Sequence, residues 1–127
     1  MSYQEDTIDW LMVDFVDRWL DAAVGDIYKV QPMAQDWARI SKVAEELGEA
    51  IQAFIGYTGQ NPRKGKINGL SDVLEELADT AITAILAIQH FTGSTSQTKF
   101  LISDKLEKIH RRTRAHLEIL DERGLRE

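Results

Sequence analysis

The chain has 127 residues, of which 43% are hydrophobic and 28% charged, with a formal net charge of −6 and no cysteine. This length and balance are typical of a single globular domain with a core of its own. The acidic charge argues against binding to a nucleic acid polymer, which needs a basic surface, and the lack of cysteine excludes disulfides and thiolate metal sites.

The N-terminal nine residues are polar and acidic, so we expect no secretory signal peptide. The longest apolar run, residues 81–88, is too short to cross a bilayer. We therefore expect a cytoplasmic protein with no membrane partner.

Apolar residues recur at three- and four-residue spacing and predict four helices. The first is expected over residues 7–24, where Gly25 would end it. A linker would follow through Pro32, and the second helix is expected over residues 34–57.

The third helix is expected over residues 70–91, after a glycine-rich loop, and either Ser71 or Asp72 is able to cap it. From Ala81 onward this helix is apolar almost all round, which is typical of a helix buried on several sides. We expect it to be central, with a second subunit completing its surroundings.

The fourth helix is expected over residues 99–123, after a break at residues 92–98, and Gly124 would stop it. Four helices without a credible strand predict an all-α fold in residues 1–127, with a four-helix bundle-like core completed by oligomerisation.

Two predicted helices carry nearly the same acidic segment. Residues 43–49 read Val-Ala-Glu-Glu-Leu-Gly-Glu and residues 73–79 read Val-Leu-Glu-Glu-Leu-Ala-Asp, at a constant offset of 30 residues. This self-similarity suggests that the two helices contribute to one site.

Residues three apart are neighbours on a helix surface, so Glu46 pairs with Glu49, and Glu76 pairs with Asp79. The short connection favours an antiparallel hairpin in which both pairs face one seam. Hard oxygen ligands without thiolates indicate Mg²⁺, with Mn²⁺ as the alternative.

A solvated acidic face explains the same pattern from periodicity alone. The repetition of the segment weighs against that interpretation, as does the lack of a lysine four residues after these acids. Both interpretations stay open at this point.

The spacing Glu45-Glu46-x-x-Glu49 followed by Glu76-x-x-Asp79 resembles the EExxE…ExxD signature of the MazG-like, all-α nucleoside triphosphate pyrophosphohydrolases. The resemblance extends over residues 37–112. It implies cleavage of a nucleoside triphosphate, whether ordinary, deoxy or modified, between the α and β phosphates to give a monophosphate and pyrophosphate.

The resemblance also implies the roles of the acids. Glu46, Glu49, Glu76 and Asp79 would bind Mg²⁺, and Glu45 would be a further ligand or the group that activates water. The protein would assemble as a homodimer or homotetramer, with sites built from helices of more than one subunit.

Five other residues are candidates for substrate binding. Members of the family often have Lys-x-x-Lys-Asn on the last helix, and here Lys105-x-x-Lys108 is followed by Ile109 in place of asparagine, and then by Arg112.

Cations of the loop between the second and third helices could contact phosphates, although a solvated loop is an equal explanation. One tryptophan could stack on a base, although aromatic residues at helical spacing more often belong to a core. The candidates are Trp37, Arg63, Lys64, Lys108 and Arg112.

Two alternatives remain. A related enzyme, the phosphoribosyl-ATP pyrophosphohydrolase of histidine synthesis, would have the same acids. A non-catalytic oligomeric module that binds nucleotides or a protein would need none of their chemistry. A di-iron oxidase is a poor fit, because Glu107-x-x-His110 has no second Glu-x-x-His partner.

Overall fold

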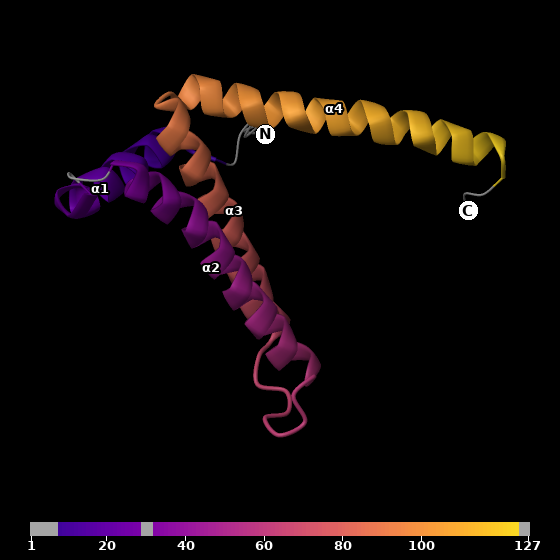
Figure 1. Ribbon diagram of the computed structural model, residues 1–127. Coiled ribbons are helices and arrows are strands. Elements are labelled where there is room, and N and C mark those ends of the chain that lie inside the picture. Colours follow the sequence, from indigo (N-terminus) through magenta and orange to yellow (C-terminus); the bar gives the residue numbers. More distant parts are fainter. Residues whose placement is uncertain (1–7, 29–31, 125–127) are drawn as a thin grey trace, which may run out of the picture. The chain divides into compact units, whose positions relative to one another are not determined.

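The computed structural model describes residues 8–28 and 32–124. It contains four helices, α1 (Trp10–Tyr28), α2 (Pro32–Thr58), α3 (Leu70–Thr92) and α4 (Thr95–Glu122), and no strand within the described ranges (Figure 1). The prediction of an all-α, bundle-like fold is confirmed. None of these helices is both long and apolar enough to cross a membrane.

Three predicted boundaries in the first half of the chain are wrong. α1 begins at Trp10 and not at residue 7, and just before it Asp9 Oδ1 accepts a hydrogen bond of 2.9 Å from the Leu11 N–H. α1 continues through Gly25 to Tyr28, because a single glycine weakens a helix by only about 1 kcal/mol relative to alanine. Pro32 is the first residue of α2 and not part of a linker. An N–H at the first position of a helix has no carbonyl partner within the helix, so the lack of an N–H in proline costs no hydrogen bond there.

α3 begins where predicted, but Gly69 is the residue that precedes its first turn. The Asp72 carboxylate accepts a hydrogen bond of 2.9 Å from the Gly69 N–H, so Asp72 stabilises the start from inside the helix. At the other end Gly93 adopts the left-handed conformation with φ 64° and ends α3.

The predicted break at residues 92–98 is too long, because only Gly93 and Ser94 separate α3 from α4. A single left-handed glycine is enough to end a helix, so no longer segment is needed between the two helices. The predicted stop at Gly124 is confirmed, since its φ is +66° and its N–H donates to the Asp121 carbonyl.

The chain divides into two compact units, one up to Thr95 and one from Ser96 onward. The second unit consists of α4 and the residues after it. Within α4, Lys108 pairs with Asp104 at 2.9 Å, an i,i+4 ion pair on the helix surface.

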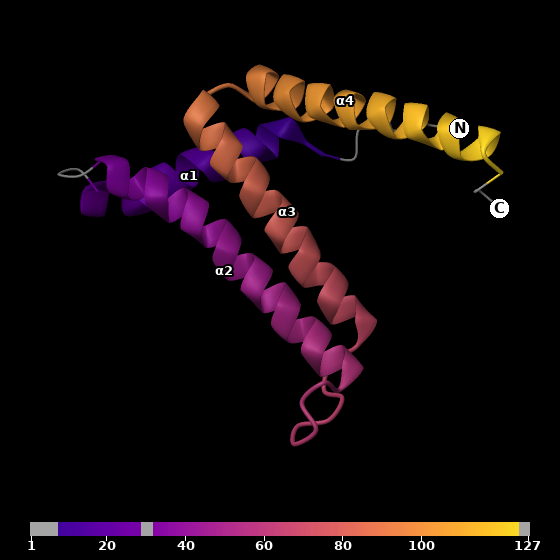
Figure 2. The same ribbon diagram turned by 45° about the vertical axis from the view of Figure 1, so that its right-hand side comes forward.

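In the first unit, α2 and α3 lie side by side as an antiparallel hairpin, and α1 packs against both (Figures 1 and 2). The predicted hairpin is therefore confirmed. The buried residues of α2 and α3 are mostly small or medium-sized, which lets the helices approach closely. They include Arg39, Ala50, Ala53, Val73, Leu86, Ala87 and Gln89.

Many large apolar side chains of the hairpin are exposed. We call six of them the apolar face: Leu47, Ile51 and Phe54 on α2, and Leu70, Leu74 and Leu77 on α3. Four of them, Leu47, Ile51, Phe54 and Leu77, line one shallow hollow of about 360 Å³. Ile82 of α3 is also 53% exposed, so the expected burial of α3 on several sides is not achieved within a single chain.

The loop after α2 folds back on the end of that helix. The N–H groups of Ile67 and Asn68 both donate to the Gly56 carbonyl, at 2.9 and 3.4 Å. A Cβ atom on Gly56 would clash with Asn68 Oδ1 and lie 2.9 Å from Ile67 Cγ1, so a larger residue would displace these two side chains.

Candidate functional site

Glu46 and Glu49 of α2 meet Glu76 of α3 in the seam of the hairpin. Each offers a carboxylate oxygen, and these oxygens lie within 4.8 Å of one another. We call these three residues the carboxylate cluster. The i,i+3 spacing on α2 predicts the first pair, and the hairpin brings the third acid to it.

The cluster is electrostatically unfavourable without a cation. The charge of Glu46, followed by desolvation and the charge of Glu76, raises the pKa of Glu49. Glu46 has only 13% of its side chain exposed. Glu76 Oε2 is buried and has no hydrogen-bond partner among the described residues. A buried carboxylate oxygen normally has a partner, so this atom is free to accept a ligand.

The structure does not bring Asp79 into this group. Within the described ranges, the carboxylates that come together here are those of Glu46, Glu49 and Glu76 alone. An aspartate side chain is one methylene shorter than the glutamate at the equivalent position of α2, so it reaches less far across the seam. Asp79 is exposed.

Glu45 also lies outside the cluster, and its side chain is 59% exposed. It is linked to the cluster by Lys42, whose Nζ donates to Glu45 Oε1 at 3.0 Å and lies 3.2 Å from Glu46 Oε1. These two carboxylates raise the pKa of Lys42. Although no lysine stands four residues after the acids, Lys42 stands four residues before Glu46, so the prediction that the acids have no lysine partner one turn away is wrong.

Three of the predicted substrate-binding residues belong to the first unit. Trp37 is 68% exposed on α2. Arg63 and Lys64 are exposed in the loop that follows Thr58, which itself lies nine residues, or about 14 Å along the helix axis, beyond Glu49. The loop folds back toward the hairpin, because Lys64 lines a small hollow together with Gln52, which lies one turn beyond Glu49 on α2.

The other two candidates, Lys108 and Arg112, are exposed on α4. They belong to the second compact unit, which begins at Ser96. The ion pair with Asp104 raises the pKa of Lys108, so this lysine is a cation at any physiological pH.

A second polar cluster joins the three helices of the first unit, and sequence reasoning missed it. Arg39 Nη2 of α2 donates to Asp17 Oδ1 at 2.9 Å and to Asp21 Oδ1 at 3.1 Å, both on α1. Its guanidinium also donates to the backbone carbonyls of Asp17 and Leu86. The i,i+4 spacing of the two aspartates on α1 was the available signal.

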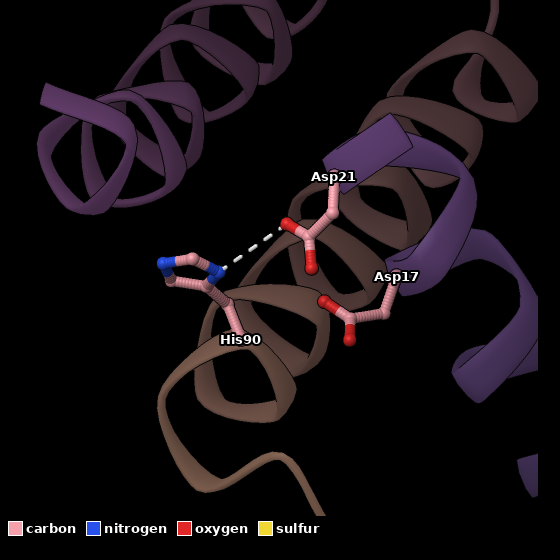
Figure 3. Close-up of side chains that lie close together, drawn as sticks. All are labelled: Asp17, Asp21 and His90. Carbon is pink, nitrogen blue, oxygen red and sulfur yellow. Dashed lines mark ion pairs between the residues drawn. The ribbon is translucent and has the colours of Figure 1, made fainter. Parts of the chain in front are cut away.

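His90 of α3 completes this second cluster. Its Nε2 lies 2.7 Å from Asp36 Oδ1. Its Nδ1 lies 3.6 Å from Asp21 Oδ1 (Figure 3). Asp17, Asp21 and His90 are close enough together to hold a metal ion. The permanently charged Arg39 already pairs with both aspartates, so the arrangement is an ion-pair network that fastens α1 to the hairpin.

Burial raises the pKa of Asp17, although the neighbouring charge of Arg39 acts in the opposite direction. Asp17 is only 6% exposed. The positive charge of Arg39 therefore offsets the desolvation cost of the ionised Asp17 carboxylate.

A hollow of about 350 Å³ lies between α1, α2 and α3. Its walls are mostly apolar, with a few polar groups, which is typical of a pocket for a small molecule. The lining residues are Val16, Leu20, Gln35, Ala38, Arg39, Lys42, Thr83 and Leu86. Lys42 both lines the hollow and pairs with Glu46, so this one side chain connects the hollow to the carboxylate cluster.

No family model, curated protein or solved structure matches the chain. The class that the described residues define is an all-α protein with a three-carboxylate site in a helical hairpin. A more specific assignment depends on the chemistry of that site.

Proposed function

We propose that the protein is a Mg²⁺-dependent nucleotide pyrophosphohydrolase of the cytoplasm. It would cleave a nucleoside triphosphate between the α and β phosphates and release a nucleoside monophosphate and pyrophosphate. The observation that carries the proposal is the carboxylate cluster, in which two helices present acidic oxygens within 4.8 Å of one another.

The donor set fits a hard divalent ion. Three carboxylates and no sulfur or imidazole favour Mg²⁺, or Mn²⁺, over zinc or copper. The partnerless Oε2 atom of Glu76 supports a ligand at this position. A bound Mg²⁺ would withdraw charge from the phosphates and lower the pKa of a bound water molecule.

Side chains of the protein would bind the ion and accept the proton. Glu46, Glu49 and Glu76 would hold the ion. Glu45, exposed one residue before Glu46, is the candidate to take a proton from the attacking water. We give Asp79 a supporting role at the edge of the site, because it is not one of the three clustered acids.

The hollow beside Lys42 is the proposed place for the base and sugar of the substrate. Its apolar walls suit a planar ring, and Gln35, whose Nε2 donates to Asp21 Oδ1, forms a polar part of the wall. Trp37 is available for stacking because it is exposed. Arg63, Lys64, Lys108 and Arg112 remain candidates for phosphate contacts.

The apolar face supports self-association into a homodimer or homotetramer. Full burial of one leucine or phenylalanine contributes about 1.5–3 kcal/mol, and six such residues are exposed on one side of the hairpin. Two hairpins packed through these faces would complete a four-helix core.

A pyrophosphate-release assay with Mg²⁺ tests the proposal on a panel of ordinary, deoxy and damaged nucleoside triphosphates. We expect Glu46→Gln, Glu49→Gln and Glu76→Gln each to lower turnover by about 100-fold or more, because each removes a metal ligand. Glu75→Gln is the matched control, since Glu75 is exposed beside Glu76 and lies outside the cluster.

Wild-type protein that releases pyrophosphate from no member of the panel would exclude the proposal in this form. Phosphoribosyl-ATP belongs in the panel, because turnover of that compound alone would identify the related enzyme of histidine synthesis.

A non-catalytic nucleotide- or protein-binding module is the second candidate. It is favoured by the ion pairs of Lys42 with Glu45 and Glu46, which make part of the acidic surface resemble an ordinary solvated face. Calorimetry with Mg²⁺ alone, and then with a non-hydrolysable triphosphate, separates the two candidates. Binding without turnover would support the module.

A further inference from the structure

Lys42 is in an unusual position for a surface lysine. Its ammonium lies 3.2 Å from Glu46, a member of the carboxylate cluster, while the residue itself also lines the hollow of about 350 Å³. It is therefore the residue that links the proposed metal ligands to the proposed substrate pocket.

The contact with Glu46 conflicts with metal binding. A divalent ion held by the cluster would need the lone pairs of Glu46, and a lysine cation within hydrogen-bond distance of the same carboxylate would repel that ion. The metal ion and the Lys42 cation therefore compete for the negative charge of Glu46.

The Lys42 ammonium is free to change its partner. Its side chain is 49% exposed, so no packed core fixes the ammonium. A lysine side chain has four methylenes and a head group with three donors, which can follow a neighbouring anion. A polyphosphate bound to the metal would bring that anion to the same place.

We infer that Lys42 is a positioning residue of the carboxylate site, which neutralises Glu46 in the metal-free protein and turns to a phosphate oxygen of the metal-bound triphosphate. This inference rests on the proposed function and assigns a role to a lysine that is not part of the EExxE pattern. In the metal-free protein the Lys42 ammonium provides the positive charge beside Glu46 that a bound metal ion would otherwise provide.

The inference predicts opposite effects on two affinities in Lys42→Met. Mg²⁺ alone should bind about two- to fivefold more tightly, because a competing cation is removed. A non-hydrolysable triphosphate in saturating Mg²⁺ should bind about tenfold more weakly, because a charge-assisted hydrogen bond is lost. Titration calorimetry measures both quantities.

Two further variants make the test specific. Lys42→Arg keeps the charge and should recover most of the triphosphate affinity. Arg18→Met is the matched control, because Arg18 forms an exposed i,i+4 pair with Asp14 on α1 and should change neither affinity. Circular dichroism of each variant shows whether the helices are retained.

The outcomes are distinguishable. If wild-type protein binds Mg²⁺ and loses it on Glu46→Gln, but Lys42→Met changes neither affinity, the inference is wrong and the proposed function stands. If both affinities fall together in Lys42→Met, the lysine only supports the fold, and the inference is again wrong. If wild-type protein binds no Mg²⁺, both the proposed function and the inference fail.

Discussion

Replacing Arg39 by methionine tests whether the ion-pair network holds α1 on the hairpin. The Arg39 side chain is 8% exposed and hydrogen-bonds to Asp17, Asp21 and the Leu86 carbonyl. Methionine fills much of the same volume but makes none of these bonds. Asp17, which is 6% exposed, would then be a buried carboxylate without a cation.

Removing one partner of a buried ion pair costs about 3–5 kcal/mol, because the remaining charge stays desolvated. This is a large part of the roughly 5–15 kcal/mol that stabilises a typical domain. Each kcal/mol lowers the melting temperature of a domain of this size by about 3–5 °C, so we expect a fall of about 10–20 °C. Thermal and urea unfolding followed by circular dichroism measure the change.

Two variants control this experiment. Arg18→Met removes an exposed pair with Asp14 and should cost less than about 1 kcal/mol. The double variant Asp17→Asn with Arg39→Met removes the buried charge with its partner and should recover part of the loss. Equal effects of Arg39→Met and Arg18→Met would refute the idea that the network is buried and stabilising.

Four further results are expected. Gly56→Ala should destabilise the protein by about 1–3 kcal/mol in urea unfolding, because its Cβ would clash with Asn68 Oδ1. Leu77→Glu should dissociate the proposed oligomer in light scattering, because it places a charge on the apolar face. Asp79→Asn should weaken Mg²⁺ binding less than Glu49→Gln, because only Glu49 belongs to the cluster. In metal-free buffer, Glu49→Gln should raise the melting temperature at pH 7 and leave it unchanged near pH 4. The pKa of Glu49 is raised in the folded protein, so the stability that this group contributes is present below its ordinary value of 4.5 and is lost as pH rises through the folded value.

Each of these results has a contrary outcome. Wild-type stability in Gly56→Ala would mean that the loop does not return to the end of α2. A monomeric wild-type protein would remove the proposed oligomer. An equal loss of Mg²⁺ affinity in Asp79→Asn and Glu49→Gln would place Asp79 among the principal ligands. A lower melting temperature of metal-free Glu49→Gln at pH 7 would contradict the repulsion among the three acids, and Glu75→Gln is the control for a general effect of charge.

The hairpin and its acidic seam could be predicted from sequence because they depend on local spacing. Glu46 and Glu49 are one turn apart on any helix, and a short loop leaves two helices little choice but to pack against each other. Helix ends were less predictable. The turn at Gly93 needs only one left-handed residue, and nothing in the composition of the following residues distinguishes loop from helix.

The packing of the hairpin could not be read from the apolar stripe. Hydrophobic periodicity marks Leu47 and Ile51 as a core side, yet within one chain the residues buried on the same helix include Ala50 and Ala53. Periodicity shows which side of a helix avoids water, but it does not show whether the cover comes from the same chain or from another one. The ion-pair network was missed for a related reason, since Asp17 and Arg39 meet only through tertiary packing.

The two acidic segments are alike in sequence but unequal in the structure. α2 contributes two carboxylates to the cluster and α3 contributes one. Thirty residues after Lys42 stands Asp72, which stabilises the first turn of α3 by accepting from Gly69, whereas Lys42 itself neutralises Glu46. The cation and most of the ligands are therefore on one helix, which also borders the hollow. If an octahedral ion were held by these three carboxylates, it would keep further coordination positions for water or phosphate oxygens, which is the arrangement that Mg²⁺ prefers.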